Sequence, residues 1–194
     1  MLASRESDFR PTGDGAILRS SDSIAFEENW EAARDGRSVP LRRSIDLKSF
    51  ANFARWFAVI EPARDRQALP FRLVGSGFFD FFGQDLTGID YLTLADPAIR
   101  QLAYDCVIAC LEQPCGLWQC TPAKTAEGTL LYEYTILPIS KGGDGADQIV
   151  VYVNFERPGN GMPAVDRLEH AEVWHWLDIG FGVPKLDLGA FAGA

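Results

Sequence analysis

The sequence predicts an α+β fold in which an antiparallel sheet packs against helices. Three observations predict it: an early short strand, a long helix after it, and three closely spaced strands after the helix. The early strand is predicted at residues 71–76, and the later strands at about 116–122, 129–140 and 148–156. Because short, turn-like connections join the last three strands, we expect them to form an antiparallel meander.

Helices are predicted on both sides of the early strand. Ser23 is expected to cap a helix that runs to Gly36, because a serine hydroxyl accepts a hydrogen bond from a free amide of the first turn. A second helix is predicted at residues 46–61, where aromatic residues recur at helical spacing and Pro62 follows. The long helix is predicted at residues 96–114, where an aspartate and a proline form a typical N-terminus.

The composition favours one domain with two extensions. The chain has 194 residues, of which 47% are hydrophobic and 23% are charged, so it can bury a full core. Residues 1–23 are polar and aperiodic, which predicts a flexible lead-in. The folded domain is expected at residues 24–156, and residues 157–194 are expected to form a C-terminal extension.

Net charge and hydropathy exclude two classes of partner. The formal net charge is -9 and no basic run is present, so a nucleic acid partner is not expected. The N-terminus has no apolar signal segment, and no stretch approaches the ~18 apolar residues of a membrane span. We therefore expect a cytoplasmic protein, in which cysteines stay reduced.

All four cysteines lie between positions 106 and 120. Cys106 and Cys110 are four residues apart on the predicted long helix, in its apolar stripe. Cys115 follows the helix, and Cys120 falls in the next strand. Packing in the core is the favoured interpretation, because free cysteine is often buried as a small apolar residue. A metal site or a redox pair stays open, although structural zinc sites usually use C-x2-C turns and this spacing differs.

Catalytic motifs are weak in this sequence. Its two histidines, His170 and His175, both lie in the C-terminal extension, and no serine nucleophile motif lies near them. The glycine-rich stretches lack the lysine and the spacing of a phosphate-binding loop. A haem would need a cysteine or one of these histidines as its axial ligand. An enzyme is therefore not expected, and no cofactor is required by the sequence.

Four motifs, in this order, resemble the PAS domain family, and in particular bacterial proteins that consist of one small PAS domain. The motifs are Val-Pro-Leu-Arg-Arg-Ser-Ile-Asp at 39–46, Phe-Arg-Leu-Val-Gly at 71–75, Leu-Thr-Gly at 86–88 and Glu-Tyr-Thr-Ile-Leu-Pro-Ile-Ser at 133–140. The resemblance covers residues 28–156. It implies a five-stranded antiparallel sheet with helices on one face, a small pocket, and a role in sensing a ligand or binding a partner protein.

Alternation along the strands predicts which side chains face the core. The predicted inward set is Phe71, Leu73, Tyr132, Tyr134, Ile136, Ile149, Val151, Val153 and Phe155. If the strand order of PAS domains holds, the last strand lies between the first strand and the strand that contains Glu133. Arg72, Glu133 and Asn154 then form a polar row across the outer face. This row is either a relay that transmits a pocket event or an ordinary salt-bridge network.

The candidate ligand pocket is built from aromatic side chains. Its predicted residues are Phe79, Phe82, Trp118, Tyr132, Tyr134 and Phe155. In a sensor, such rings can stack on a flat ligand. The alternative is that the aromatic run at 78–82 only closes the core, as short aromatic helices commonly do.

The C-terminal extension has two interpretations. Residues 165–177 fit an amphipathic helix, while residues 173–179 also fit a strand. Its aromatic residues, Trp174, Trp176 and Phe181, either pack on the chain's own sheet or form a contact with a partner.

The functional expectation is a stand-alone sensory or regulatory module. With no output domain visible in the sequence, we expect signalling through contact with an unidentified protein, with a homodimer and a small-molecule ligand as further expectations. The alternative is a small enzyme, or a metal- or haem-binding protein, on a similar sheet.

Overall fold

The structure is a computed structural model that describes residues 19–46, 48–126, 128–155 and 165–186. Three α-helices are present in this part of the chain: α1 (Ser21–Ala33), α2 (Ser76–Phe82) and α3 (Arg100–Glu112). The strands are β1 (Phe57–Ile60), β2 (Phe71–Val74), β3 (Gly116–Thr125), β4 (Gly128–Ile139), β5 (Gln148–Phe155), β6 (Val165–Leu168) and β7 (Val173–Leu177). The short 3-10 helices are η1 (Arg42–Ser44), η2 (Ala54–Trp56), η3 (Arg64–Arg66), η4 (Tyr91–Thr93) and η5 (Pro97–Ile99).

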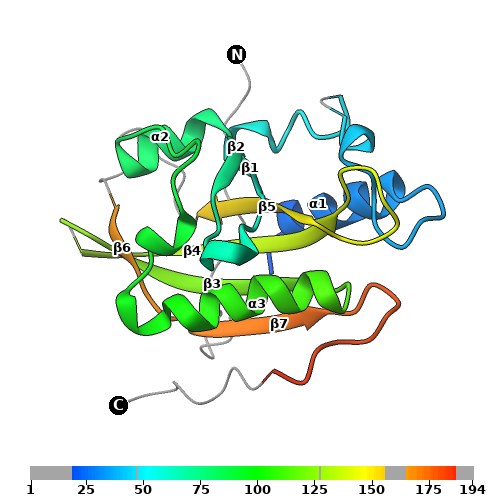
Figure 1. The fold of residues 1–194 in the computed structure, drawn as a ribbon. Coiled ribbons are helices and arrows are strands. Elements are labelled where there is room, and N and C mark those ends of the chain that lie inside the picture. The colour runs from blue at the N-terminus through cyan, green and yellow to red at the C-terminus, as the bar shows by residue number, and fades with distance from the viewer. Residues whose placement is uncertain (1–18, 47, 127, 156–164, 187–194) are drawn as a thin grey trace.

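All these strands join one antiparallel sheet (Figure 1). The strand order is β2-β1-β5-β4-β3-β6, and β7 also pairs with β3. The predicted meander is present, since β3 pairs with β4 and β4 pairs with β5. Strands β1 to β5 make the expected five-stranded sheet, and β6 and β7 extend it along the free side of β3.

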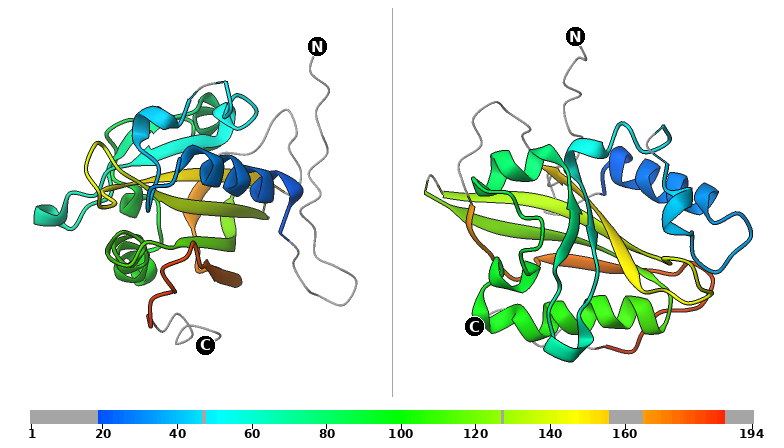
Figure 2. Two further views of the ribbon diagram at one scale, coloured as in Figure 1. Left: turned by 90° about the vertical axis from the view of Figure 1, so that its right-hand side faces the viewer. Right: turned by 45° about the horizontal axis from the view of Figure 1, so that its top comes forward.

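Helices cover both faces of this sheet. The inner face, which we define as the one facing α2 and α3, carries the larger apolar cluster, with Phe81, Val107 and Ile149 among its members. The outer face carries a second cluster, where Phe26 and Trp30 of α1 pack against the strands. In Figure 1 α3 lies in front of the strands and α1 behind them, and Figure 2 shows the same arrangement from two further directions.

The predicted helix at 46–61 is wrong. Residues 50–56 form turns and the 3-10 helix η2, and residues 57–60 are strand β1. Strand β1 lies between β2 and β5 and is buried on both faces: Ala58 and Ile60 contact the inner cluster, and Val59 the outer one. A strand buried on both faces is a continuous apolar run, which its periodicity cannot distinguish from a helix. The strand predicted first in the chain is therefore β2.

Leu73 faces the outer side of the sheet, not the core side that alternation predicts. Phe71 pairs with Ile60 and faces the core as predicted, but a register shift follows, and Leu73 then pairs with the outward-facing Val59. Because directly paired residues share a face, Leu73 lies on the outer face and is 44% exposed.

The first helix begins earlier than predicted. Ser20, not Ser23, is its N-cap, and the Ser20 hydroxyl accepts a hydrogen bond from the Ser23 amide at 3.1 Å. The Ser23 hydroxyl instead hydrogen-bonds with the Thr135 hydroxyl of β4 at 2.5 Å. The predicted lead-in, residues 1–23, lies outside the described residues up to position 18.

The described part of the C-terminal extension packs on the chain's own sheet. Residues 165–177 form two strands and not a helix, and the strand interpretation holds for 173–177. Strand β6 pairs with the end of β3 around Ala123, and β7 pairs with its beginning, from Gly116 to Cys120. Among the described residues no helix has the length and apolar character needed to cross a membrane.

Candidate functional site

The inner face encloses a cavity of about 50 Å³ between the strands and helices α2 and α3. Phe82 from α2, Val107 from α3, and Tyr132, Tyr134 and Val151 from the central strands line it. These positions follow from the geometry of strands and helices. Alternate residues of a strand face the helices, and residues three or four apart on a helix face the sheet. The walls are almost entirely apolar, so the cavity suits an apolar ligand.

Three of the six predicted pocket residues line this cavity, namely Phe82, Tyr132 and Tyr134. Phe155 is buried behind the wall, where its ring centroid lies 4.6 Å from that of Phe81 and 6.0 Å from that of Tyr132. Phe155 therefore supports the cavity from behind.

The structure does not bring Phe79 or Trp118 into the cavity. Helix α2 buries Phe78 and Phe81, three residues apart, and leaves Phe79 between them 56% exposed. On β3, Leu117 faces the cavity, so the next residue, Trp118, faces the opposite side of the sheet. Strand parity from Leu117 was the signal that could have excluded Trp118.

Three tyrosines carry the polar atoms of the cavity: Tyr91, which sequence reasoning missed, Tyr132 and Tyr134. Burial raises the pKa of each phenol, so all three are neutral near pH 7. The Tyr134 hydroxyl accepts a hydrogen bond from the Gln119 side-chain amide. The buried Tyr132 hydroxyl makes no hydrogen bond of ordinary geometry with any described residue, although the Thr121 hydroxyl nearby opposes the rise in its pKa. A bound ligand with one polar atom would satisfy it.

A second cavity, of about 40 Å³, adjoins the first. The two share Tyr91, Ala103, Cys106 and Tyr134. The second is more polar because Gln119 and Thr121 of β3 line it. Its far wall comes from the C-terminal extension and contains Glu169, His170 and Trp174. The extension thus completes the site, which the sequence did not predict because the fold of residues 165–177 was undecided.

The four cysteines do not converge on one point. Cys106, Cys110 and Cys115 pack in the inner cluster, while Cys120 faces the opposite side of the sheet. Burial raises the pKa of Cys106 to about 12 and the pKa of Cys110 well above its usual value, so both are neutral thiols. Within the described residues no three His, Cys, Asp or Glu side chains are grouped to hold a metal ion.

The outer face carries a buried carboxylate at Glu133, whose exposed fraction is 1%. It accepts hydrogen bonds from the Ser20 amide at 3.2 Å, the Trp118 indole at 2.7 Å and the Asn154 amide at 3.3 Å, and also from the Ser20 hydroxyl. Burial raises the pKa of Glu133, and these hydrogen bonds oppose that shift in part. The stacked ring of His175 lies behind Trp118, 5.5 Å away between centroids.

The structure brings together two members of the predicted polar row. Glu133 and Asn154 are directly paired on β4 and β5. Arg72 lies apart on edge strand β2, because β1 and β5 separate β2 from β4. Glu133 and Asn154 lie on the outer face as predicted, but helix α1 covers them there, and the missed third member is Ser20 at the start of that helix.

Comparison with known proteins agrees with this fold. The sequence model of the family described as "PAS domain" matches residues 18–150, which is more than half of the 194 residues. The chain therefore belongs to the PAS domain family, as its motifs predict.

A solved structure is also similar to this chain. It is the crystal structure of the PAS domain of a protein from Colwellia psychrerythraea, with a TM-score of 0.42 and 14% sequence identity. The match covers 56% of this chain and 95% of that chain. A comparison with curated proteins finds no match.

Proposed function

We propose that this chain is a sensory module that binds a small, mainly apolar molecule in the inner cavity. Binding would cause a movement of the sheet that is transmitted to helix α1. A cavity of about 50 Å³ has room for a molecule of a few heavy atoms. The unsatisfied Tyr132 hydroxyl adds a preference for one polar atom on that molecule. The proposed activity is binding, and it involves no catalytic step.

The observation that carries this proposal is the alternation of contacts along β4. Tyr132 and Tyr134 face the cavity, while Glu133 and Thr135, which alternate with them, contact the N-terminal turn of α1. In a close-packed core, we expect a ligand that displaces the two tyrosines to shift the backbone between them as well. The hydrogen bonds from Ser20 to Glu133 then transmit that movement to the helix.

The output we propose is a protein contact made by α1. The helix exposes Ile24, which is 44% accessible, on the side away from the sheet. A shift of this surface would change its contact with a partner. That partner is a second copy of the chain, in a homodimer, or an unidentified signalling protein. We place the activity in the cytoplasm, a compartment that keeps cysteine thiols reduced.

Xenon is the probe that tests the cavity, because it is small, apolar and known to enter dry protein cavities. Under xenon pressure we expect the methyl resonances of Val107, Ile136 and Val151 to shift in two-dimensional NMR spectra. Val107→Phe fills the cavity and is expected to abolish these shifts. The control Val183→Phe adds the same bulk at a position that is 41% exposed and should change nothing.

Amide NMR spectra recorded under the same xenon pressure test transmission to helix α1. We expect the amides of Ser20 and Ser23 to shift with xenon in the wild-type chain and not in Glu133→Gln. Cavity shifts without any response at Ser20 and Ser23 would reject the relay, and the absence of both responses would reject the whole proposal. If Val107→Phe fails to fold, Ala103→Leu, one turn earlier on α3 and also at the cavity wall, replaces it.

A further inference from the structure

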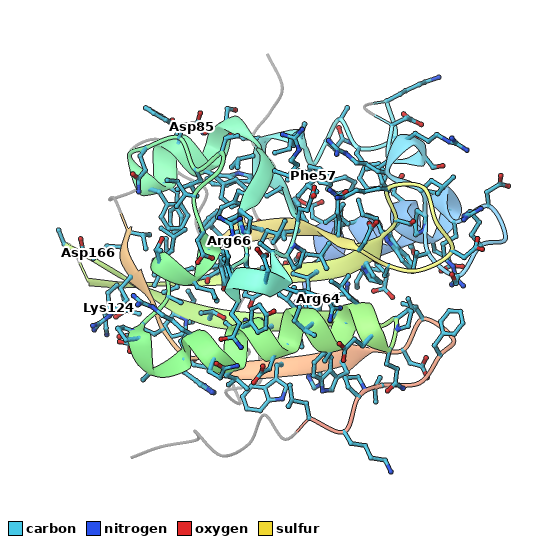
Figure 3. All side chains as sticks on the ribbon, viewed as in Figure 1. Phe57, Arg64, Arg66, Asp85, Lys124 and Asp166 are labelled. Atoms are coloured by element: carbon cyan, nitrogen blue, oxygen red, sulfur yellow. The ribbon has the colours of Figure 1, made fainter. Side chains whose placement is uncertain are left out.

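The outer face of the sheet holds another pocket, larger than the inner cavity and separate from it. Its volume is about 280 Å³. The floor is formed by Val59 of β1 and Val150 of β5, and the walls by Ile45, Phe50 and Leu73. Val59 and Val150 face away from the inner cavity, so the full thickness of the sheet separates the two sites. Figure 3 labels Phe57, which also lines this outer pocket.

Three of the four motifs that resemble the PAS family contribute to this outer pocket. Arg42, Ile45 and Asp46 belong to the first motif, the segment 73–75 to the second, and Ile139 to the fourth. The inner cavity draws on the second and fourth motifs and takes nothing from the first. The arginine-containing segment thus has no part in the function proposed above.

The backbone holds this segment firmly against the sheet. The Arg42 amide donates to the Ser140 carbonyl at 2.7 Å, and the Ser140 amide donates to the Pro40 carbonyl at 2.9 Å. These two bonds fix residues 40–42 beside the end of β4. The backbone from which the Arg42 side chain extends is therefore fixed at the pocket wall.

This pocket contains one positively charged and one negatively charged side chain, those of Arg42 and Asp46. Within the described ranges the Arg42 guanidinium makes neither a hydrogen bond nor an ion pair. The other charged residue of the wall, Asp46, already accepts hydrogen bonds from the Lys48 and Ser49 amides at 2.7 and 2.9 Å. These bonds hold the pKa of Asp46 below its usual value, so its carboxylate stays ionised, and they direct one carboxylate oxygen toward the amides of its own segment. Arg42 is left as the group that can bind a ligand charge.

We propose that the outer pocket binds an amphipathic anion, meaning an apolar chain or ring with one terminal carboxylate. The apolar body would lie over Val59 and Val150, and the carboxylate would pair with the guanidinium of Arg42, which suits bidentate contact. The size is adequate, because a cavity of about 150 Å³ already binds benzene in another protein. This site is independent of the inner cavity and of the function proposed for it.

Octanoate is the probe for this site, and 1-octanol is its uncharged counterpart with the same chain. In a titration followed by amide NMR, we expect octanoate to shift the amides of Arg42, Ile45 and Gly75. Arg42→Gln is expected to weaken octanoate binding about tenfold, as loss of a charge-assisted hydrogen bond predicts. Binding of 1-octanol should stay unchanged in that variant.

Arg43→Gln is the matched control, because Arg43 has the same charge one residue along but does not line the pocket. An equal loss in Arg43→Gln would show general attraction of the anion and overturn the proposal. Shifts confined to Val107 and Tyr134 would place octanoate in the inner cavity and overturn it as well. Ala54→Trp, which fills the pocket from its exposed rim, is expected to abolish binding of both probes.

Discussion

Glu133→Ala is expected to lower the free energy of unfolding by about 3 kcal/mol, because it leaves several buried donors without an acceptor. The Trp118 indole, the Asn154 amide and the Ser20 amide all donate to this carboxylate in the folded chain. None of them can turn to water, since Trp118, Asn154 and Ser20 are themselves buried. Urea denaturation measures the loss.

Glu28→Ala is the matched control for this substitution. Glu28 lies on the exposed side of α1, so removal of its carboxylate is expected to change the free energy of unfolding by no more than about 0.5 kcal/mol. If Glu133→Ala is no more destabilising than Glu28→Ala, the Glu133 network does not hold α1 to the sheet, and the proposed relay loses its basis.

Glu133 also predicts a pH dependence of stability. Its pKa is raised in the folded chain, mainly by burial, so between its unfolded and folded pKa values the folded state binds more protons than the unfolded state. Stability contributed by the protonated carboxyl is therefore fully present below about pH 4.5, the unfolded value, and is lost as pH rises through the folded pKa. The amide introduced by Glu133→Gln cannot titrate, so that variant lacks this dependence.

The measurement is the free energy of unfolding of the wild-type chain minus that of Glu133→Gln, determined from about pH 4 upward. We expect this difference to fall as pH rises above about 4.5. The subtraction removes the contribution of other groups that titrate alike in both chains. A difference that rises with pH would mean that hydrogen bonding outweighs burial and that the carboxylate is the favoured form.

The parts of the fold that rest on local patterns could be predicted from the sequence. Alternation on β4 and β5 placed Tyr132, Tyr134 and Phe155 on the core side, and Asp96 with Pro97 marked the start of the helical segment before β3. These signals depend on residues close together in the chain. They sufficed for the fold class and for half of the cavity-lining candidates.

What the sequence could not provide depends on distant contacts. Strand β1 is an apolar run whose identity is decided by β2 and β5 on either side, so its residues fit a helix equally well. Ser20 contacts Glu133 across a separation of 113 positions, which no local pattern records. Nothing in the sequence of α1 shows which face of the sheet it covers, so its packing over Glu133 could not be predicted.

Gly75→Ala is the second large effect that we expect. A β-carbon at this position would lie 2.2 Å from the Ala54 carbonyl oxygen and 2.4 Å from that of Arg55. Both atoms belong to the backbone, so no side-chain rotation relieves the contact. The Gly75 amide also donates to the Phe57 carbonyl at 2.8 Å, which fixes the close approach of the two segments. We expect a loss of about 3 kcal/mol in the free energy of unfolding, at the upper end for overpacking.

Gly142→Ala separates this steric effect from the general cost of removing a glycine. Both glycines avoid the left-handed region, and a β-carbon at Gly142 meets no atom within 4 Å. Its effect on the free energy of unfolding is therefore expected to stay within about 0.5 kcal/mol. Equal stability of the two variants in urea denaturation would show that β2 and η2 lie further apart than the structure has them. Because Gly75 also lines the outer pocket, a wider separation at this point would also leave more space for octanoate.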